Sequence, residues 1–592
     1  METTDGTTPY VAMVIMPVMD LAPTGSASVV GTEAESPAPE SVPECGETCS
    51  ADSPLVERRS AGVTLPPSPP LSEPGSEDPE GKPFSRTTLR VIAVGTVVVL
   101  VASLLMRFWT VSDLWLDEAL TVNIARLPLH EIPSFLKRDG APPLYYVMLH
   151  FWMGWFGTSD EAVRSLSGVI GVVTVPCAWL AGRRLAGRTG GWAAMLLVAT
   201  SPFAIRYDTE TRMYSLVALL TVLGFLALDR SIRHPRPGNL IAVAAVTGLL
   251  LYTHYWSLYL IGTVMLWLAW TAWRGQTLWR RGARASLVAG AVGCATFLPW
   301  LPTFLFQSAH TGTPWAGPAT FAGMVSAVAS FAGGSTSQGR ALALIFFALT
   351  GLGLFGVATD RHHIDLDIRT RPLGRPVAIA VGGTLVAAEA GGYLTDSAFD
   401  ARYASVVLIP LILLVAIGLT TFRDRRVRAA MLTGAVLLGL LGSIPDVTTN
   451  RTQAGQVAAA IAAHGKPGDI LAYCPDQLGP AVNRLLPQGR YLQTSFPRGT
   501  SPVFVNWVDY AATVRAASPL AFAEHLESLA AASGRQIFLV WAGGYQAYGL
   551  KCEGIVVTLQ QNPSYRVQQL VTRNAVSFYQ PMWMMRFTPI RP

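Results

Sequence analysis

Charged residues are scarce in this chain of 592 residues: Asp, Glu, Lys and Arg make up only 14% of it, against 51% hydrophobic residues. Apolar runs of roughly 16–23 residues recur between Val91 and Ile444, and runs of that length suit a bilayer-spanning helix. The net charge of +6 comes from short arginine clusters between these runs, which membrane topology produces and nucleic-acid binding does not require. The composition therefore predicts a polytopic membrane protein without a nucleic-acid partner.

Signatures of metal and nucleotide sites are also missing. The six cysteines are scattered without the spacing of a metal site. No GxGxxG or GxxxxGK[ST] sequence follows a predicted strand in the C-terminal segment, so nucleotide binding has no support. Aromatic residues are few in residues 1–85, where Pro, Ser, Glu and Gly dominate. This tail cannot bury enough apolar surface to offset its chain entropy, and we predict that it is disordered and cytoplasmic.

The membrane domain is predicted to extend over residues 86–446 with about eleven spans. The apolar stretch 143–157 would be one crossing too many, since it would place every arginine cluster outside the cell. We therefore predict that it is interfacial or re-entrant, which leaves the N-terminus cytoplasmic. The predicted spans are roughly 88–109, 160–182, 190–206, 213–229, 239–254, 255–273, 285–305, 340–358, 376–393, 404–420 and 428–445.

After about residue 446 the composition becomes typical of a globular domain. Residues 470–474 and 536–541 are apolar and are predicted to form strands. A helix is predicted before the first strand, at 456–464, and another between the two strands, at 521–532. Residues 447–592 are therefore predicted to form an α/β domain. An odd number of spans would place this domain outside the cytoplasm.

An adjacent acid pair, Asp117 and Glu118, directly follows the first span. Apolar residues recur at helical spacing on both sides of Pro128, which predicts two helices too short to cross a bilayer. We expect these helices to lie on the membrane surface and to hold the carboxylates at the boundary between water and lipid. The alternative is an ordinary solvated loop in which the acid pair begins a helix.

A second group of ionisable residues lies between later spans: Asp208 and Glu210 in one loop and His254 in another. Such groups cost about 2.5–3.5 kcal/mol each at membrane depth, so they are candidates for function. Together they would bind a divalent cation such as Mg²⁺ or Mn²⁺, or one acid would act as a general base. In the alternative, the acids only cap helices and the histidine is a hydrogen-bonded structural residue.

Several short motifs occur in a characteristic order: DLWLDEA, DGAPPLYY, FGTSDEAVRSLS, AGRRLAG, SPFAIRYDTETRMYSL, YTHYW and FDARYASVVLIPL. The ordered set resembles the bacterial branch of the GT-C glycosyltransferases, the protein mannosyltransferase and aminoarabinose transferase-like proteins, over residues 110–420. The resemblance implies sugar transfer from a polyprenyl-phosphate donor on the outer face of the membrane. It implies that Asp117 is the catalytic acid of the first loop, that Asp208 or Glu210 belongs to the second acidic motif, and that Arg402-Tyr403 opens a late span.

One position departs from the family pattern. The family usually has His or Lys before the sequence PPL, and this chain has Ala141. A donor-phosphate or metal contact would then be missing or supplied by another cation. The candidate substrate-binding residues are Lys137, Arg138, Tyr145, Arg212, Tyr214, Arg402 and Tyr403, with Asp117 and Glu118 as catalytic candidates.

We therefore expect a mainly α-helical GT-C membrane glycosyltransferase in a bacterial plasma membrane, with a C-terminal α/β domain. The layout favours a lipid-borne donor because nucleotide sugars are cytoplasmic and the predicted cytoplasmic loops are too short to house a site. The sugar would be mannose-like or arabinose-like, and the acceptor a glycan, lipid or protein of the cell envelope. The alternatives are a transporter or flippase for a polyprenyl-linked glycan, using the same cavity without catalysis, and an inactive scaffold.

Two cysteines, Cys474 and Cys552, fall in the domain predicted to lie outside, where disulfides persist. Cys474 ends a predicted strand, and Cys552 follows the turn Gly543-Gly544 after another, so neighbouring strands would bring them together. Two unpaired buried thiols are the alternative.

Overall fold

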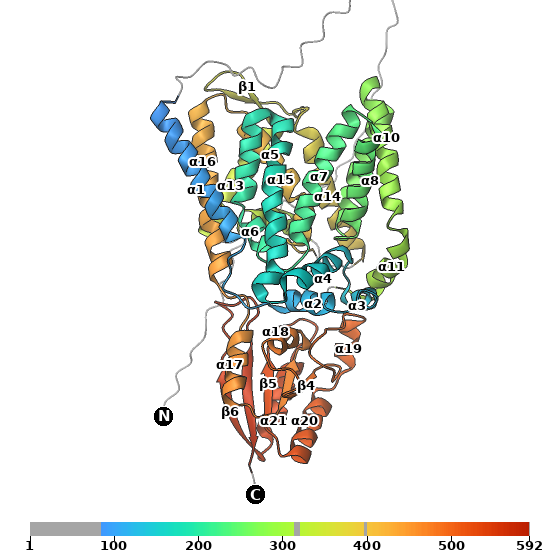
Figure 1. The fold of residues 1–592 in the computed structure, drawn as a ribbon, viewed down its shortest axis with the longest axis vertical. Coiled ribbons are helices and arrows are strands. Elements are labelled where there is room, and N and C mark those ends of the chain that lie inside the picture. Colours follow the sequence, from blue (N-terminus) through green and yellow to red (C-terminus); the bar gives the residue numbers. More distant parts are fainter. Residues whose placement is uncertain (1–83, 313–319, 335, 396–398, 591–592) are drawn as a thin grey trace, which may run out of the picture. The chain divides into compact units, whose positions relative to one another are not determined.

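The computed structural model describes residues 84–312, 320–334, 336–395 and 399–590. The predicted disordered tail lies almost wholly outside the described residues. The described chain consists of a membrane domain of helices followed by a smaller domain built on a sheet (Figure 1).

Long apolar helices make up the membrane domain. Among the described residues, seven helices are long and apolar enough to cross a membrane. A helix lies within each of the predicted span ranges, but several are short or merged, so the count of about eleven stays a prediction. The main helices of this domain are α1 (Arg86–Met106), α5 (Asp160–Ala199), α7 (Tyr214–Arg233), α8 (Pro237–Leu251), α9 (Ser257–Arg274), α10 (Thr277–Ala295), α13 (Ser337–Phe355), α14 (Arg375–Thr395), α15 (Leu408–Leu419) and α16 (Arg425–Thr448).

The helix α15 lies at the centre of the membrane domain. All twelve of its residues, LIPLILLVAIGL, are buried, as expected of a helix that is apolar on every side. It packs against α5 and α13. By contrast, α1 keeps a row of valines and leucines exposed along its length. Exposed apolar side chains on a helix of 21 residues suit contact with lipid.

The helix α5 is two helices joined at a sharp bend. Ala186 and Gly187 leave the helical conformation there, and Gly187 has a φ of 67°, which glycine adopts without strain. The backbones of Gly182 and Gly190, on either side of the bend, approach closely because neither residue has a side chain. This bend separates the predicted spans 160–182 and 190–206.

Three short helices follow α1 and lie between the membrane helices and the C-terminal domain: α2 (Leu116–Ala125), α3 (Ile132–Asp139) and α4 (Leu144–Phe156) (Figure 1). The helix α3 ends at Gly140, whose φ of 89° needs glycine. The 13 residues of α4 give a length of about 20 Å, short of the ~30 Å hydrocarbon core of a bilayer. The helix therefore agrees with the prediction that residues 143–157 do not cross.

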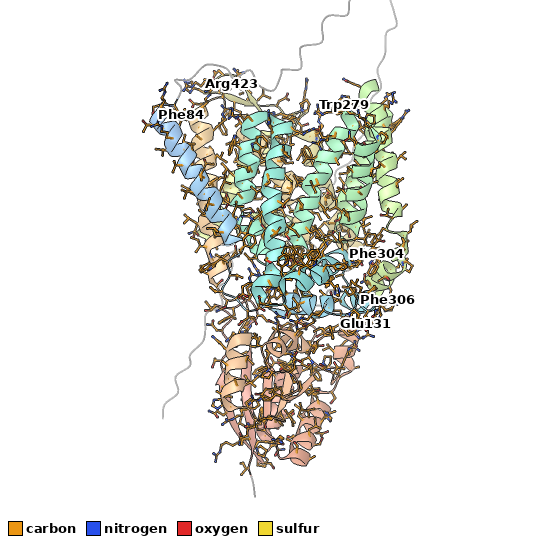
Figure 2. The ribbon with its side chains drawn as sticks, viewed as in Figure 1. Phe84, Glu131, Trp279, Phe304, Phe306 and Arg423 are labelled. Atoms are coloured by element: carbon orange, nitrogen blue, oxygen red, sulfur yellow. A yellow bond between two sulfur atoms is a disulfide. The ribbon has the colours of Figure 1, made fainter. Side chains whose placement is uncertain are left out.

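Short elements complete the membrane domain. They are α6 (Pro202–Asp208), η1 (Leu298–Trp300), α11 (Leu301–His310), α12 (Phe321–Phe331), the strand pair β1 (Gly356–Ala358) and β2 (Ile364–Leu366), and η2 (Tyr403–Val407). Figure 2 places Phe84, Trp279 and Arg423 at one end of the helices and Glu131, Phe304 and Phe306 at the other, beside the C-terminal domain.

The C-terminal domain has a five-stranded sheet in the order β4-β3-β5-β7-β6. Strands β4, β3 and β5 are parallel, and β7 pairs antiparallel with both β5 and β6. The predicted strands at 470–474 and 536–541 are confirmed as β3 and β5. The elements are α17 (Ala454–His464), β3 (Ile470–Cys474), η3 (Asp476–Leu478), α18 (Gly479–Arg484), β4 (Leu492–Ser495), α19 (Tyr510–Ala516), α20 (Pro519–Ser533), β5 (Ile537–Trp541), α21 (Lys551–Gln561), β6 (Tyr565–Val571) and β7 (Trp583–Pro589).

Helices cover both faces of this sheet. Residues of α17 and α18 form one core with one face, and residues of α20 and α21 form another core with the opposite face. Cys474 and Cys552 form a disulfide, with their Cα atoms 5.5 Å apart. The two predicted strands are neighbours, since β3 pairs with β5, and Cys552 lies on α21, the helix that follows β5, so the bond joins this helix to β3.

Candidate active site

The first turn of α2 sends two neighbouring carboxylates to different surroundings. Trp115 is extended, and the helix begins immediately after it, so Asp117 and Glu118 both fall in the first turn. Successive residues of an α-helix point about 100° apart. The side chain of Asp117 is 17% exposed, whereas that of Glu118 is completely buried.

Asp117 faces two arginines that come from distant parts of the chain. Nη1 of Arg402, directly before η2, donates a hydrogen bond of 2.9 Å to Oδ2 of Asp117. Nη2 of Arg212, in the loop between α6 and α7, lies 3.9 Å from the same oxygen. We call Asp117, Arg212 and Arg402 the open cluster. One partly exposed carboxylate between two cations can take a proton, and the cations can bind a phosphate.

Three further groups hold Arg212 in place. Its Nη1 donates to Oγ1 of Thr121 at 3.1 Å and to the hydroxyl of Tyr146 at 3.4 Å. The Tyr146 hydroxyl in turn donates to Oδ2 of Asp139 at 2.8 Å. Burial raises the pKa of Asp139, and the charge of Arg212 together with the Tyr146 hydrogen bond opposes this rise. Residues of α2, α3 and α4 thus orient the arginine toward Asp117.

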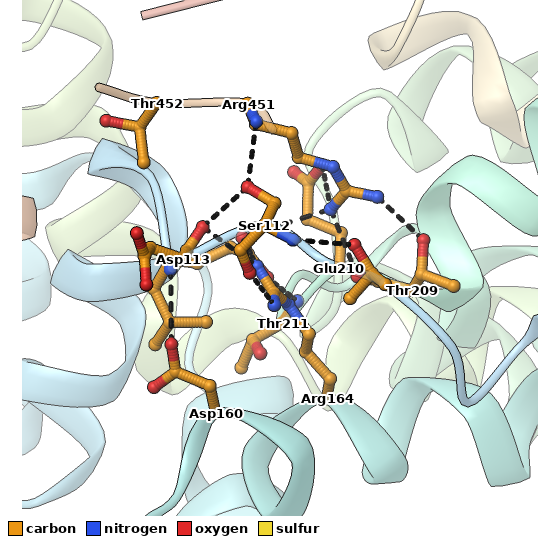
Figure 3. A network of polar contacts seen from close by, with 12 residues as sticks. Ser112, Asp113, Asp160, Arg164, Thr209, Glu210, Thr211, Arg451 and Thr452 are labelled. Carbon is orange, nitrogen blue, oxygen red and sulfur yellow. Dashed lines mark hydrogen bonds and ion pairs between the residues drawn. The ribbon is translucent and has the colours of Figure 1, made fainter. Parts of the chain in front are cut away.

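Glu118 belongs to a different, closed arrangement, and Figure 3 labels its neighbours Arg164, Thr211 and Arg451. Its carboxylate accepts hydrogen bonds of 2.8 and 2.6 Å from Nε and Nη2 of Arg164, on α5. The backbone N–H of Thr211 adds a third, at 3.0 Å. Burial alone would raise the pKa of Glu118, but Arg164 and Arg451 more than offset this and lower it. This carboxylate connects α2 to α5 and to the loop that carries Arg212.

Arg451 joins the same arrangement from the segment that leads into the C-terminal domain. Its guanidinium donates to the carbonyl and hydroxyl oxygens of Thr209 at 3.0 and 2.7 Å. It also lies 3.9 Å from Glu118 and 3.8 Å from Glu210, and Glu210 forms a 2.7 Å ion pair with Arg206. We call Glu118, Glu210, Arg164, Arg206 and Arg451 the closed network.

The predicted metal ligands Asp208, Glu210 and His254 do not form one site. Asp208 pairs with Arg107 at 2.9 Å, Glu210 pairs with Arg206, and Nδ1 of His254 accepts the backbone N–H of Trp256. Among the described residues, no group of three His, Cys, Asp or Glu side chains is placed to hold a metal ion. The reason is that each acid already has a cationic partner. These residues therefore do not fit the predicted cation.

The other predicted site residues divide into two sets. Tyr214 and Tyr403 pack their rings against His254, at centroid distances of 5.8 and 5.7 Å, and Tyr403 adjoins Arg402 in the chain. The Tyr403 ring also lies 5.4 Å from the Arg402 guanidinium, so these residues lie beside the open cluster. The second set points elsewhere. Tyr145 is buried and bonds Ser167, while the exposed Lys137 and Arg138 stand over the rings of Phe306 and Phe135.

Sequence reasoning missed several residues that shape the site. Arg164 and Asp139 lie within or beside the quoted motifs, so the charge they carry in an apolar context was a usable signal. Arg451 gave no such signal, because an isolated arginine after a span reads as an ordinary headgroup anchor. Glu118 was predicted to be catalytic, but its complete burial and its three hydrogen bonds indicate a structural role.

Comparisons with known proteins bear on this geometry. A family model described as dolichyl-phosphate-mannose-protein mannosyltransferase matches residues 140–302. No curated protein matches the chain by sequence. Among solved structures, apo ArnT from Cupriavidus metallidurans is 16% identical with a TM-score of 0.50, covering 85% of this chain and 98% of that one.

This is the GT-C fold, of the protein mannosyltransferase and ArnT type.

Two further solved structures are similar to the chain at lower TM-scores. The same ArnT bound to undecaprenyl phosphate is 15% identical, with a TM-score of 0.48 and coverage of 85% of this chain and 98% of that chain. The oligosaccharyltransferase of Archaeoglobus fulgidus is 12% identical, with a TM-score of 0.46 and coverage of 79% and 71%. The resemblance noted in the motifs is confirmed, and so is the predicted class, a mainly helical multi-pass GT-C protein with a C-terminal α/β domain. The GT-C match favours a transferase over a transporter.

Proposed function

We propose that the protein transfers a mannose-like or arabinose-like sugar from a polyprenyl-phosphate donor to an acceptor of the cell envelope. The observation that carries the proposal is the open cluster, where a partly exposed carboxylate faces two arginines. The matched family model is named for transferases that use dolichyl-phosphate mannose, a polyprenyl-phosphate sugar. A phosphate leaving group and a base are the two needs of such a transfer.

In the proposed reaction, Asp117 removes the proton of an acceptor hydroxyl while the oxygen attacks C1 of the sugar. The bond between C1 and the phosphate oxygen breaks, the configuration at C1 inverts, and polyprenyl phosphate leaves with the bonding electron pair. Arg212 and Arg402 stabilise the negative charge of the phosphate. Arg402 forms an ion pair of 2.9 Å with Asp117. A bound phosphate would compete for this arginine and release the carboxylate to act as a base.

The proposed setting is the outer face of a bacterial plasma membrane, with the N-terminus in the cytoplasm. Arg423 and Trp279, beside two of the arginine clusters, lie at the end of the helices away from the C-terminal domain (Figure 2). The open cluster lies at the other end, since α2 contacts α18 of that domain. Positive loops on the cytoplasmic side would then place site and domain outside.

The test is a transfer assay with purified protein and a panel of donors, polyprenyl-phosphate mannose, arabinose and glucose, with a cell-envelope extract as acceptor. We expect release of polyprenyl phosphate and a glycosylated product from one of these donors. Release that also occurs without acceptor would indicate hydrolysis. The proposal fails if none of the donors is consumed, and movement of intact lipid-linked sugar across a vesicle membrane would then favour the flippase.

A further inference from the structure

The C-terminal domain contains a pocket of about 370 Å³ between α21 and the sheet, separate from the open cluster. Its volume lies at the lower end of the range of about 300–1,000 Å³ typical of small-molecule sites. The sheet supplies Trp541, Trp583 and Gln569, and α21 supplies Glu553, Val557 and Gln560. The helix α21 contacts β6. The wall thus combines aromatic, aliphatic, amide and carboxylate groups.

The two tryptophans are placed together by strand register. Trp541 ends β5 and Trp583 begins β7, and the antiparallel pairing sets them directly opposite each other. Their rings stack with centroids 4.3 Å apart and an interplanar angle of 15°. Arg573 stands over the Trp583 ring at 5.2 Å. Both tryptophans are only half-buried, so this rigid aromatic surface stays partly open.

Two polar atoms of the pocket wall are buried without a hydrogen bond. Neither Nε1 of Trp541 nor Oε2 of Glu553 has a partner among the described residues. Buried polar groups are nearly always hydrogen-bonded, because an unsatisfied one destabilises the folded state. The pocket therefore offers an unused donor and an unused acceptor next to an aromatic surface.

We propose that this pocket binds one saccharide unit of a glycan acceptor. The C–H groups of a sugar ring match the electron-rich face of an indole. Sugar hydroxyls both donate and accept hydrogen bonds, so they suit Glu553, the Trp541 N–H and the amides of Gln560 and Gln569. An anionic ligand would be repelled by Glu553, and a purely apolar one would leave its carboxylate unsatisfied. Saccharide binding stands by itself, whereas the acceptor role rests on the proposed function.

The position of the pocket suits an acceptor. Tyr579 precedes Trp583 by four residues, a separation of at most about 14 Å. The Tyr579 ring meets Trp115 edge to face at 5.1 Å, and Trp115 directly precedes α2. The Arg402 guanidinium lies 6.0 Å from the same Trp115 ring. A glycan held against the tryptophan stack therefore lies on the side of the domain that meets the open cluster.

The test is saturation-transfer NMR on the full-length protein in nanodiscs, with soluble oligosaccharides of mannose, arabinose and glucose as probes. We expect binding of at least one probe by the wild type. The Trp541→Ala change removes the stacking surface and should weaken binding about tenfold or more. Glu553→Gln keeps the side-chain shape and should weaken saccharide binding measurably. Glu524→Gln makes the same change at an exposed position of α20 and should leave binding unchanged.

The acceptor role has its own readout. In transfer to a glycan acceptor, Trp541→Ala and Glu553→Gln should raise the KM for acceptor and leave kcat unchanged. The saccharide site is overturned if no probe binds the wild type, or if the Trp541→Ala and Glu553→Gln proteins bind as the wild type does. Normal KM values in variants that have lost binding would overturn the acceptor role. Binding by a protein that transfers no sugar from any donor would contradict the proposed function and leave the pocket assignment intact.

Discussion

Asp117 and Glu118 are neighbours in one helical turn, yet their surroundings differ in every respect that matters for chemistry. Asp117 is partly exposed and faces two arginines, Arg212 and Arg402. Glu118 is fully buried, and its two oxygens accept three hydrogen bonds from Arg164 and Thr211. In the proposed reaction, the open cluster exchanges a partner for substrate, whereas the closed network is fully paired and stays intact. Burial and partners therefore separate a candidate base from a structural acid.

We expect the closed network to stabilise the folded protein. Glu118→Gln leaves Arg164 charged and buried without its counterion, which typically costs about 3–5 kcal/mol. We expect a clear fall in the thermal unfolding midpoint of the detergent-purified protein. Asp117→Asn is the matched control, since it makes the same kind of change one residue away. An unchanged midpoint in the Glu118→Gln protein would mean that the network does not stabilise the fold.

We expect changes in the open cluster to lower the rate of sugar transfer. Removing one preorganised hydrogen-bond donor that stabilises charge in a transition state typically lowers the rate by about 10²–10³-fold. We expect a loss of that order for Arg402→Ala. Arg402→Lys keeps the charge but not the planar fork and should recover part of the rate. Transfer assays at saturating donor, with unfolding midpoints measured in parallel, check both variants. Wild-type rates in Arg402→Ala would remove this arginine from the site.

Asp476 offers a third kind of carboxylate, buried in the C-terminal domain and hydrogen-bonded by the hydroxyls of Tyr510 and Tyr548. Burial raises its pKa to about 6 from the ordinary 3.8. Between these values the folded protein keeps a proton that the unfolded chain has released. This contribution to stability is therefore present below pH ~4 and is lost as the pH rises to ~6.

The Asp476→Asn variant cannot titrate at this position. The wild-type midpoint should fall by at least about 2–4 °C between pH ~4 and ~6 because of this group, and the variant should lack that part of the fall. Identical pH dependence of wild type and variant would contradict the raised pKa.

The long apolar runs predicted the helical membrane domain, and the resemblance of the ordered motifs predicted its GT-C type. These motifs also contain Asp117, Arg212 and Arg402, which the structure brings together although they come from distant loops. The sequence did not reveal that Glu118, Asp208 and Glu210 each pair with an arginine, since it shows an acid but not its partner. What the sequence could not supply was the identity of each partner.

The most direct test of the central claim compares single-turnover sugar transfer in the Asp117→Asn and Glu118→Gln proteins at a temperature where both are folded. We predict that Asp117→Asn loses transfer by about 10²–10⁴-fold while keeping a wild-type unfolding midpoint. Glu118→Gln should retain most of its transfer rate with a lowered midpoint. The reverse pattern, or a near-normal rate in Asp117→Asn, would contradict the assignment of the reaction to the open cluster.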